Sequence, residues 1–169
     1  MITVDFVKIM ARYNQWQNGS IYAAASRLGD ADRKADRGIF FGSIHATLNH
    51  VLWADQMWLM RFGAAQAPVA KSLADGLHQH EDWDELTAQR VAFDTAILNW
   101  ADAIVAADLA GDLNWISGAT GRAMQSPKGL AVTHLFNHQT HHRGQVHGLL
   151  TGFGIKPDMT DLPFAPFLT

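Results

Sequence analysis

Five of the nine histidines lie in one segment, HLFNHQTHHRGQVH, which covers residues 134–147. Within it, His138 and His142 are four residues apart, a spacing that places two side chains on one face of an α-helix, one turn apart. The same face carries an apolar stripe, formed by Leu135, Val146, Leu149 and Phe153. The pattern predicts that these two imidazoles point into the protein interior.

A buried imidazole needs a partner, because burying it unpaired costs roughly 1–3 kcal/mol. One divalent metal ion would satisfy both side chains at nitrogen–metal distances of about 2.0–2.1 Å. Hydrogen bonds to backbone or water would satisfy them as well, so the spacing alone leaves a metal site and a pair of core histidines open. His134 and His141 lie to one side of the stripe and are the alternative ligands within this segment.

A third histidine with a buried setting lies in residues 42–62, GSIHATLNHVLWADQMWLMRF, a stretch that is apolar almost all round and typical of a central helix. His50 has mostly small neighbours on its face, which leave space beside it, so it is the predicted third ligand. His45 lies on another side of the helical wheel and is predicted to be exposed. His78 and His80 lie in a polar loop and are predicted to be solvated.

Three neutral histidines leave at least one position open on a divalent ion, which is typical of a catalytic rather than a structural site. Such an ion could activate a water for hydrolysis or deprotonate a thiol for attack on an electrophile. The chain has no cysteine, so the thiol would have to be a cosubstrate. A non-catalytic ion that serves folding or binding is the competing hypothesis, and it predicts a fourth protein ligand.

Few other residues carry an obvious chemical role. No glutamate follows a ligand as in H-E-x-x-H, so the usual base of a zinc hydrolase is missing. Gln145 could orient a ligand or bond another helix, and Arg143 is predicted to point away from the apolar stripe and pair with an acid. Asp55 could support a metal ligand or form an ion pair, and the structural role is favoured. Trp53 and Met57 are either pocket-lining residues or plain core.

Four helical stretches must position the three histidines. Apolar residues recur at spacings of three and four over residues 3–28, 42–62, 82–107 and 127–153. Thr3 or Asp5 could cap the first helix, and Ser126 is predicted to cap the fourth with Pro127 at its first position. The pattern predicts an all-α fold with one domain over residues 1–169.

The connections at residues 63–82 and 108–126 are too long for a minimal up-down-up-down bundle and favour at least one parallel neighbouring pair. LNWIS and RAM flank a glycine-rich centre in the second connection, which predicts a short hairpin there. The proline-rich tail, with Phe164 and Phe167, is predicted to pack across the bundle or onto a partner.

Composition excludes several classes of protein. The net charge is −3 and no basic block is present, so phosphate-neutralising nucleic-acid binding is not expected. No apolar run approaches the ~20 residues of a membrane span. The N-terminus has Asp5 and Lys8 within its apolar pattern and does not look like a signal peptide. A cytoplasmic protein without membrane contact is expected.

The strings ARYNQWQN, LNHVLWADQMWL and NHQTHHRGQVHGLL resemble the DinB/YfiT-like family, in order and over nearly the whole chain. This is the damage-inducible DinB, unrelated to the polymerase of that name. The resemblance implies an up-down-down-up four-helix bundle and a divalent metal bound by His50, His138 and His142. It also implies a homodimer. Several related proteins are transferases or isomerases that use mycothiol, bacillithiol or glutathione.

Together these observations favour a metal-dependent enzyme, such as a thiol S-transferase acting on a small electrophile. Zinc or nickel is the expected ion, and iron also suits three imidazoles. The sequence leaves open whether the site is catalytic, which thiol and substrate it takes, and what Gln145, Arg143, His134 and His141 do.

Overall fold

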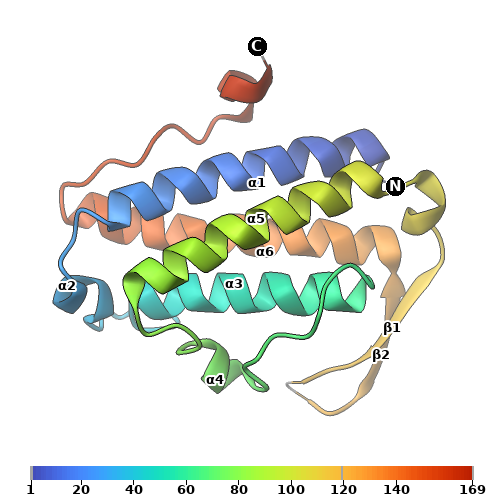
Figure 1. Ribbon diagram of the computed structural model, residues 1–169, viewed down its shortest axis with the longest axis horizontal. Helices are drawn as coiled ribbons and strands as arrows, with labels where there is room; N and C mark the ends of the chain where they lie inside the picture. The colour runs from blue at the N-terminus through green and yellow to red at the C-terminus, as the bar shows by residue number, and fades with distance from the viewer. Residues whose placement is uncertain (1, 119, 169) are drawn as a thin grey trace.

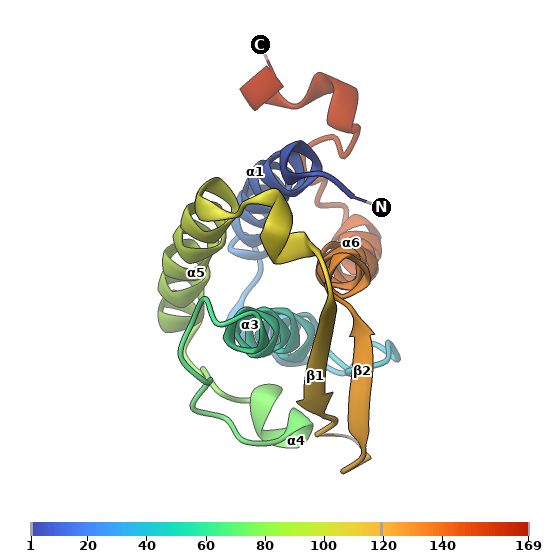
Figure 2. The same cartoon turned by 90° about the vertical axis from the view of Figure 1, so that its right-hand side faces the viewer.

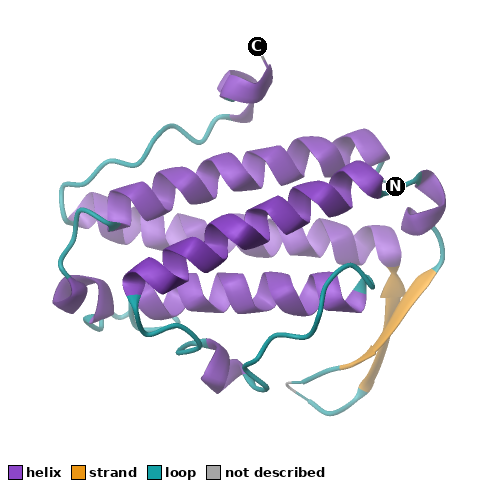
Figure 3. Ribbon diagram, in the orientation of Figure 1, coloured by secondary structure: helices purple, strands orange, loops and turns teal. Residues whose placement is uncertain are grey.

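The computed structural model describes residues 2–118 and 120–168 and consists mainly of long α-helices (Figures 1 and 3). The four long helices are α1 (Val4–Ala25), α3 (Ile44–Arg61), α5 (Trp83–Ala103) and α6 (Lys128–Gly152). The predicted all-α fold is confirmed. Within the described residues, the chain forms no helix with both the length and the hydropathy that crossing a membrane requires.

The four helices form a bundle with the predicted up-down-down-up topology. Along the colour gradient of Figure 1, α1 and α6 run in one direction, and α3 and α5 run in the other. Figure 2 looks along the bundle and shows one helix at each corner, with α1 and α3 each packed between α5 and α6. The helix pair α3 and α6, which carries the three histidines, is therefore antiparallel and in direct contact.

Side-chain caps explain where three of the helices begin. The hydroxyl groups of Thr3 and Ser43 accept hydrogen bonds from backbone amides at the starts of α1 and α3, and the carboxylate of Asp82 does the same at α5. Each cap satisfies one of the amide groups that an α-helix leaves unpaired at its N-terminus. Thr3, rather than Asp5, is the cap of α1.

The connections between the long helices contain short elements of their own. These are α2 (Asp30–Lys34), α4 (Leu73–Gly76), η1 (Ala106–Leu109), β1 (Asp112–Ile116) and β2 (Ala123–Pro127), with η2 (Leu162–Phe164) and η3 (Pro166–Leu168) in the tail. β1 and β2 form the predicted hairpin, which projects beside the start of α6 (Figure 1).

The predicted start of the fourth helix is wrong by one residue. Ser126 pairs with Leu113 and Pro127 pairs with Asp112 in the hairpin, so both are still extended. Pro127 takes the N-cap position, where it makes no side-chain cap bond, and α6 begins at Lys128. The third helix likewise ends at Ala103, earlier than residue 107, because Ile104 is extended before η1.

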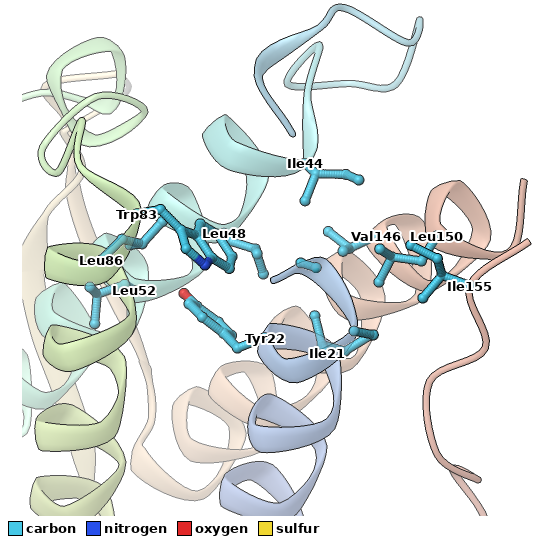
Figure 4. Packing of buried hydrophobic residues seen from close by; sticks show 12 residues of the cluster. Ile21, Tyr22, Ile44, Leu48, Leu52, Trp83, Leu86, Val146, Leu150 and Ile155 are labelled. Atoms are coloured by element: carbon cyan, nitrogen blue, oxygen red, sulfur yellow. The ribbon is translucent and has the colours of Figure 1, made fainter. Parts of the chain in front are cut away.

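Apolar side chains from all four helices close the end of the bundle near α2 (Figure 4). Tyr22 of α1 stacks on Trp83 of α5 with ring centroids 5.5 Å apart. Other buried members of this cluster are Ile21, Leu48, Leu52, Leu86, Val146 and Leu150. A second apolar cluster fills the opposite half of the bundle. The polar residues of the site lie on the same helices, so these two clusters fix their position.

The C-terminal tail lies along α1 (Figures 1 and 2). The Tyr13 hydroxyl donates a 2.8 Å hydrogen bond to the Thr160 carbonyl, and the Gln17 amide donates to the Met159 carbonyl at 3.0 Å. Phe167 packs edge-on against Trp16, whereas Phe164 is 70% exposed. The tail therefore packs on the bundle of its own chain, as one of the two sequence alternatives predicted.

Candidate metal centre

His50 of α3 and the α6 residues His138 and His142 lie together where the two helices pack. One nitrogen from each imidazole lies within 4.8 Å of the other two. The Nε2 atoms of His50 and His138 are 3.0 Å apart. Ligands bonded tetrahedrally at about 2.0–2.1 Å are separated by roughly 3.3 Å, so this spacing suits a shared ion. The group fits a divalent metal, and the identity of that metal does not follow from the geometry.

The three imidazoles are neutral at ordinary pH, as metal ligands must be. Burial lowers the pKa of His50 and of His138 to about 3, and repulsion from neighbouring imidazoles adds to the effect. Burial also lowers the pKa of His142. Each ring therefore keeps at least one unprotonated nitrogen near pH 7.

The second nitrogens of the three rings differ in their surroundings. The Nδ1 of His142 lies 2.8 Å from the Oε1 of Gln145, so the ring donates its proton there and leaves Nε2 free. Gln145 thus orients the ring of His142, and its predicted role toward a metal ligand stays a prediction. The Nδ1 atoms of His50 and His138 are buried and make no hydrogen bond within the described residues. A bound ion would offset part of the cost of burying these rings.

Phe41 covers one side of the cluster. Its ring centroid lies 4.0 Å from that of His50 and 5.2 Å from that of His142. Phe41 belongs to the turn that leads into α3, where Gly42 has a positive φ of 77°. The sequence interpretation missed Phe41, because no spacing rule connects a loop residue to two separate helices.

A cavity of about 350 Å³ lies on another side of the histidines and is bounded by α3, α4, α6 and the hairpin. His50 and His138 form part of its wall, and the predicted pocket residues Trp53 and Met57 line it. Trp58, Arg61 and Trp115 also line it, and no sequence pattern indicated these three. The volume lies within the range of about 300–1,000 Å³ that small-molecule sites occupy.

The loop around α4 holds Trp53 in the cavity wall. The Trp53 indole donates a 3.0 Å hydrogen bond to the Ala70 carbonyl. Gly76 lies against the same ring, and a Cβ there would be 2.6 Å from it. Only glycine permits this approach, so α4 is packed closely onto the site.

The sequence model of the DinB family matches residues 3–169. The chain belongs to the DinB family. Protein DinB of Bacillus subtilis (strain 168) is 23% identical over 165 residues, covering 98% of this chain and 96% of that protein. A DinB-like protein of Bacillus cereus ATCC 10987, known from a crystal structure, has the same fold with a TM-score of 0.62. It is 18% identical, and the match covers 85% of this chain and 90% of that chain.

A buried ionic network lies beside the histidines of this DinB-family protein. Arg90 of α5 pairs with Asp55 at 2.6 Å and with Asp94 at 2.9 Å. The Gln139 amide donates a 2.8 Å hydrogen bond to the other oxygen of Asp55. The predicted structural ion pair of Asp55 is confirmed. Burial raises the pKa of Asp55 to about 6, while the charge of Arg90 and the hydrogen bonds from Gln139 and Arg90 favour the ionised carboxylate.

The prediction for Arg143 is wrong. Its side chain is 5% exposed and donates to the side-chain oxygens of Asn14 and Asn18 on α1. The same two asparagines donate to Asp94, so amides stand between Arg143 and the nearest acid. Arg143 therefore links α6 to α1. Its partners lie 125 or more positions away in the sequence, so the helical wheel of α6 does not reveal them.

The prediction that His45 is exposed is also wrong, because its side chain is only 2% exposed. Its Nε2 bonds the His80 carbonyl at 2.8 Å, and Asn49 bonds both the amide and the carbonyl of His80. The loop before α5 is thereby held over α3. His80 itself is partly covered and lies 3.0 Å from Glu85, whereas His78 is 65% exposed as predicted.

The two alternative ligands lie outside the cluster. His134 lines the cavity and contacts the Trp58 ring with a centroid distance of 5.0 Å. His141 is exposed and touches His142 ring to ring at 4.8 Å. Neither supplies a nitrogen to the convergent group. The geometry favours the three ligands first predicted.

Proposed function

We propose that this protein is a metal-dependent enzyme that transfers a low-molecular-weight thiol to a small electrophile. His50, His138 and His142 hold the ion, which is zinc or nickel, with iron as a further choice. The observation that carries the proposal is the convergence of three neutral imidazoles beside a cavity of about 350 Å³. Within the described residues, no fourth carboxylate, thiolate or imidazole completes the group, so a coordination position is left for a substrate atom.

When bound, the ion lowers the pKa of a thiol or water that reaches its open position. The chain's own residues supply orientation and shape. Gln145 fixes the ring of His142, and Phe41 shields His50 and His142 on the side away from the cavity. Trp53 and Met57 provide an apolar wall for the electrophile. In the transfer, the sulfur bonds the electrophilic carbon, the leaving group departs with its electron pair, and the thiol proton passes to solvent.

Two observations favour thiol transfer over the alternatives. The carboxylate base of a typical zinc hydrolase is missing, because no Asp or Glu of the described residues lines the cavity, and a histidine base would have to be His134. A structural metal needs a closed site, whereas this group lies against a cavity. The homodimer and the cytoplasmic location expected from the sequence stay predictions.

The test is a conjugation assay on zinc- or nickel-loaded protein. Glutathione, bacillithiol and mycothiol are each paired with 1-chloro-2,4-dinitrobenzene, and the thioether is quantified by chromatography. The proposal expects a conjugation rate above background for at least one thiol, lost in His138→Ala and kept in the exposed control His78→Ala. Metal-dependent ester cleavage without thiol would indicate the hydrolase instead. Metal binding without turnover of either kind would indicate a non-catalytic protein.

A further inference from the structure

Arg61, at the end of α3, is a cation without an acidic partner. Its guanidinium carbon lies 4.6 Å from the ring centroid of Trp58 and 5.8 Å from that of Trp115. No described carboxylate forms an ion pair with it, and burial alone lowers its pKa. Stacking on two indoles holds the planar group in place and leaves its N–H edges available, the geometry that suits a carboxylate.

Arg61 lines two cavities that differ in charge. The cavity of about 420 Å³ at the end of the bundle also contains Lys128 and the carboxylate of Asp108. The cavity beside the histidines contains Lys71 and, among the described residues, no carboxylate at all. Lys71 makes only a 3.4 Å contact with the Pro68 carbonyl and is otherwise exposed. Negative charge is therefore missing on the histidine side, where a ligand could supply it.

The remainder of that wall is aromatic and apolar. Trp53, Met57, Trp58, Leu73 and Trp115 surround the space between Arg61 and the histidines. Indole faces at this density favour a flat, apolar ligand body, and the two cations of the wall disfavour a polyamine. The positive end and the histidine end of the cavity are distinct, so a bound molecule would have one orientation.

We propose that this cavity binds a small organic carboxylate with an aromatic or planar apolar body. Its carboxylate bonds Arg61, with Lys71 adding positive charge at the edge, and its body lies against Trp53 and Trp58. The opposite end of the ligand then faces His50 and His138. One part of this inference rests on the proposed function, namely that the ligand end beside His50 and His138 is the end that reacts. The carboxylate belongs either to the electrophile or to the thiol cosubstrate.

The experiment is isothermal titration calorimetry on chelator-treated, metal-free protein with phenylacetate and its neutral analogue 2-phenylacetamide. Phenylacetate is expected to bind at least about tenfold more tightly, equivalent to roughly 1.4 kcal/mol. Arg61→Gln is expected to abolish the difference, and Arg61→Lys to retain part of it because the charge remains without the planar fork. Lys71→Met is expected to weaken phenylacetate binding about two- to fivefold, as a partly screened surface charge does.

The control is Lys128→Met, which removes a cation from the other cavity and should leave phenylacetate binding unchanged. Equal binding of acid and amide by wild-type protein would overturn the inference without any variant having to fold. A larger effect of Lys128→Met than of Lys71→Met would also overturn it, since the anion would then occupy the other cavity.

Repeating the titrations with S-methylglutathione, and then with zinc present, identifies the source of the carboxylate. An Arg61→Gln effect on phenylacetate alone assigns it to the electrophile, and an effect on S-methylglutathione as well as on phenylacetate assigns it to the thiol. Both results support the inference. Selective carboxylate binding by protein that takes up no zinc would refute the metal enzyme while the anion site stands. Zinc uptake without carboxylate selectivity would refute the anion site alone.

Discussion

Two polar clusters lie next to each other in the core and are built on the same helices. On α6, His138 and His142 face the histidine cluster, whereas their immediate neighbours Gln139 and Arg143 face the ionic network. On α3, His50 belongs to the first cluster and Asp55 to the second. On α6, the change in side-chain direction from one residue to the next thus separates two sets of buried polar groups, and the two sets have different partners.

The two clusters differ in how their polar groups are paired. In the network, Asp55, Arg90 and Asp94 form ion pairs. The Gln139 amide bonds the second oxygen of Asp55, and the Asn18 amide bonds the Asp94 oxygen that faces Arg90, while Arg90 Nε and Gln139 Oε1 have no partner among the described residues. In the histidine cluster, two nitrogens face each other at 3.0 Å and two others are buried without a partner. Groups of opposite charge that pair hold helices together, whereas three imidazole nitrogens that converge beside a cavity suit a shared ligand.

The largest expected effect is loss of the network. Asp55→Ala removes one of the two carboxylates that pair with Arg90 and the acceptor of the Gln139 hydrogen bond. It should lower the free energy of unfolding by about 3–5 kcal/mol. Urea denaturation of the metal-free protein measures this. The matched control is Asp84→Ala, an exposed first-turn position on α5, which should lower stability by no more than about 1 kcal/mol. An equally small effect of Asp55→Ala would remove the structural role from the network.

Zinc should stabilise the protein through the histidine cluster. At free zinc about a thousand times its Kd, binding to the folded state adds roughly 4 kcal/mol, which raises Tm by about 8–16 °C for a chain of this size. Differential scanning calorimetry with and without zinc measures the shift. His50→Ala should abolish it and His78→Ala should preserve it. A shift of the same size in His50→Ala would place the ion elsewhere.

Gln145 should affect the metal and not the fold. Its bond to His142 selects the ring nitrogen that is left for the ion, so Gln145→Ala should weaken zinc affinity about 10- to 100-fold. Competition with a chromophoric chelator measures the Kd. Gln125→Ala, which removes an exposed hairpin amide, is the control. Unchanged affinity in Gln145→Ala would mean that packing alone orients the ring.

The smallest effect is expected at His45, which belongs to neither cluster. Burial lowers the pKa of His45 in the folded state, so the unfolded chain takes up its proton first as the pH falls. Its contribution to stability is complete above the unfolded pKa of about 6.5 and is lost progressively below it. His45→Gln should therefore make the unfolding free energy fall less steeply between pH 7 and pH 5. The slope against pH should change by at most the amount that one titrating proton produces. The slope in His78→Gln should match wild type, and an unchanged slope in His45→Gln would contradict the burial.

Local patterns predicted what depends on short spacings. The four helices follow from apolar periodicity, and the i,i+4 spacing brings His138 and His142 together. The small neighbours of His50 indicated its buried position. Contacts between distant segments were not predictable in this way. Arg143 was misplaced because its partners are on α1, and His45 because the loop at His80 closes over it.

The hairpin shows that local sequence also failed to predict the backbone conformation where two segments pair. Ser126 and Pro127 have the residue types of a helix start, and only their pairing with β1 keeps them extended. Phe41, Arg61 and Trp115 reach the site from a turn, the end of α3 and strand β1. Their roles depend on how the connections fold back onto α3 and α6, which no single segment encodes.

The central claim is the three-histidine metal centre, and its most direct test is the metal content of untagged protein, measured by elemental mass spectrometry. The account predicts about one divalent ion per chain in the wild type and in the controls His134→Ala and His141→Ala. It predicts loss of that ion in His50→Ala, His138→Ala and His142→Ala. Wild-type protein that takes up no metal after incubation with zinc or nickel, or an ion retained when His138 is removed, would contradict it.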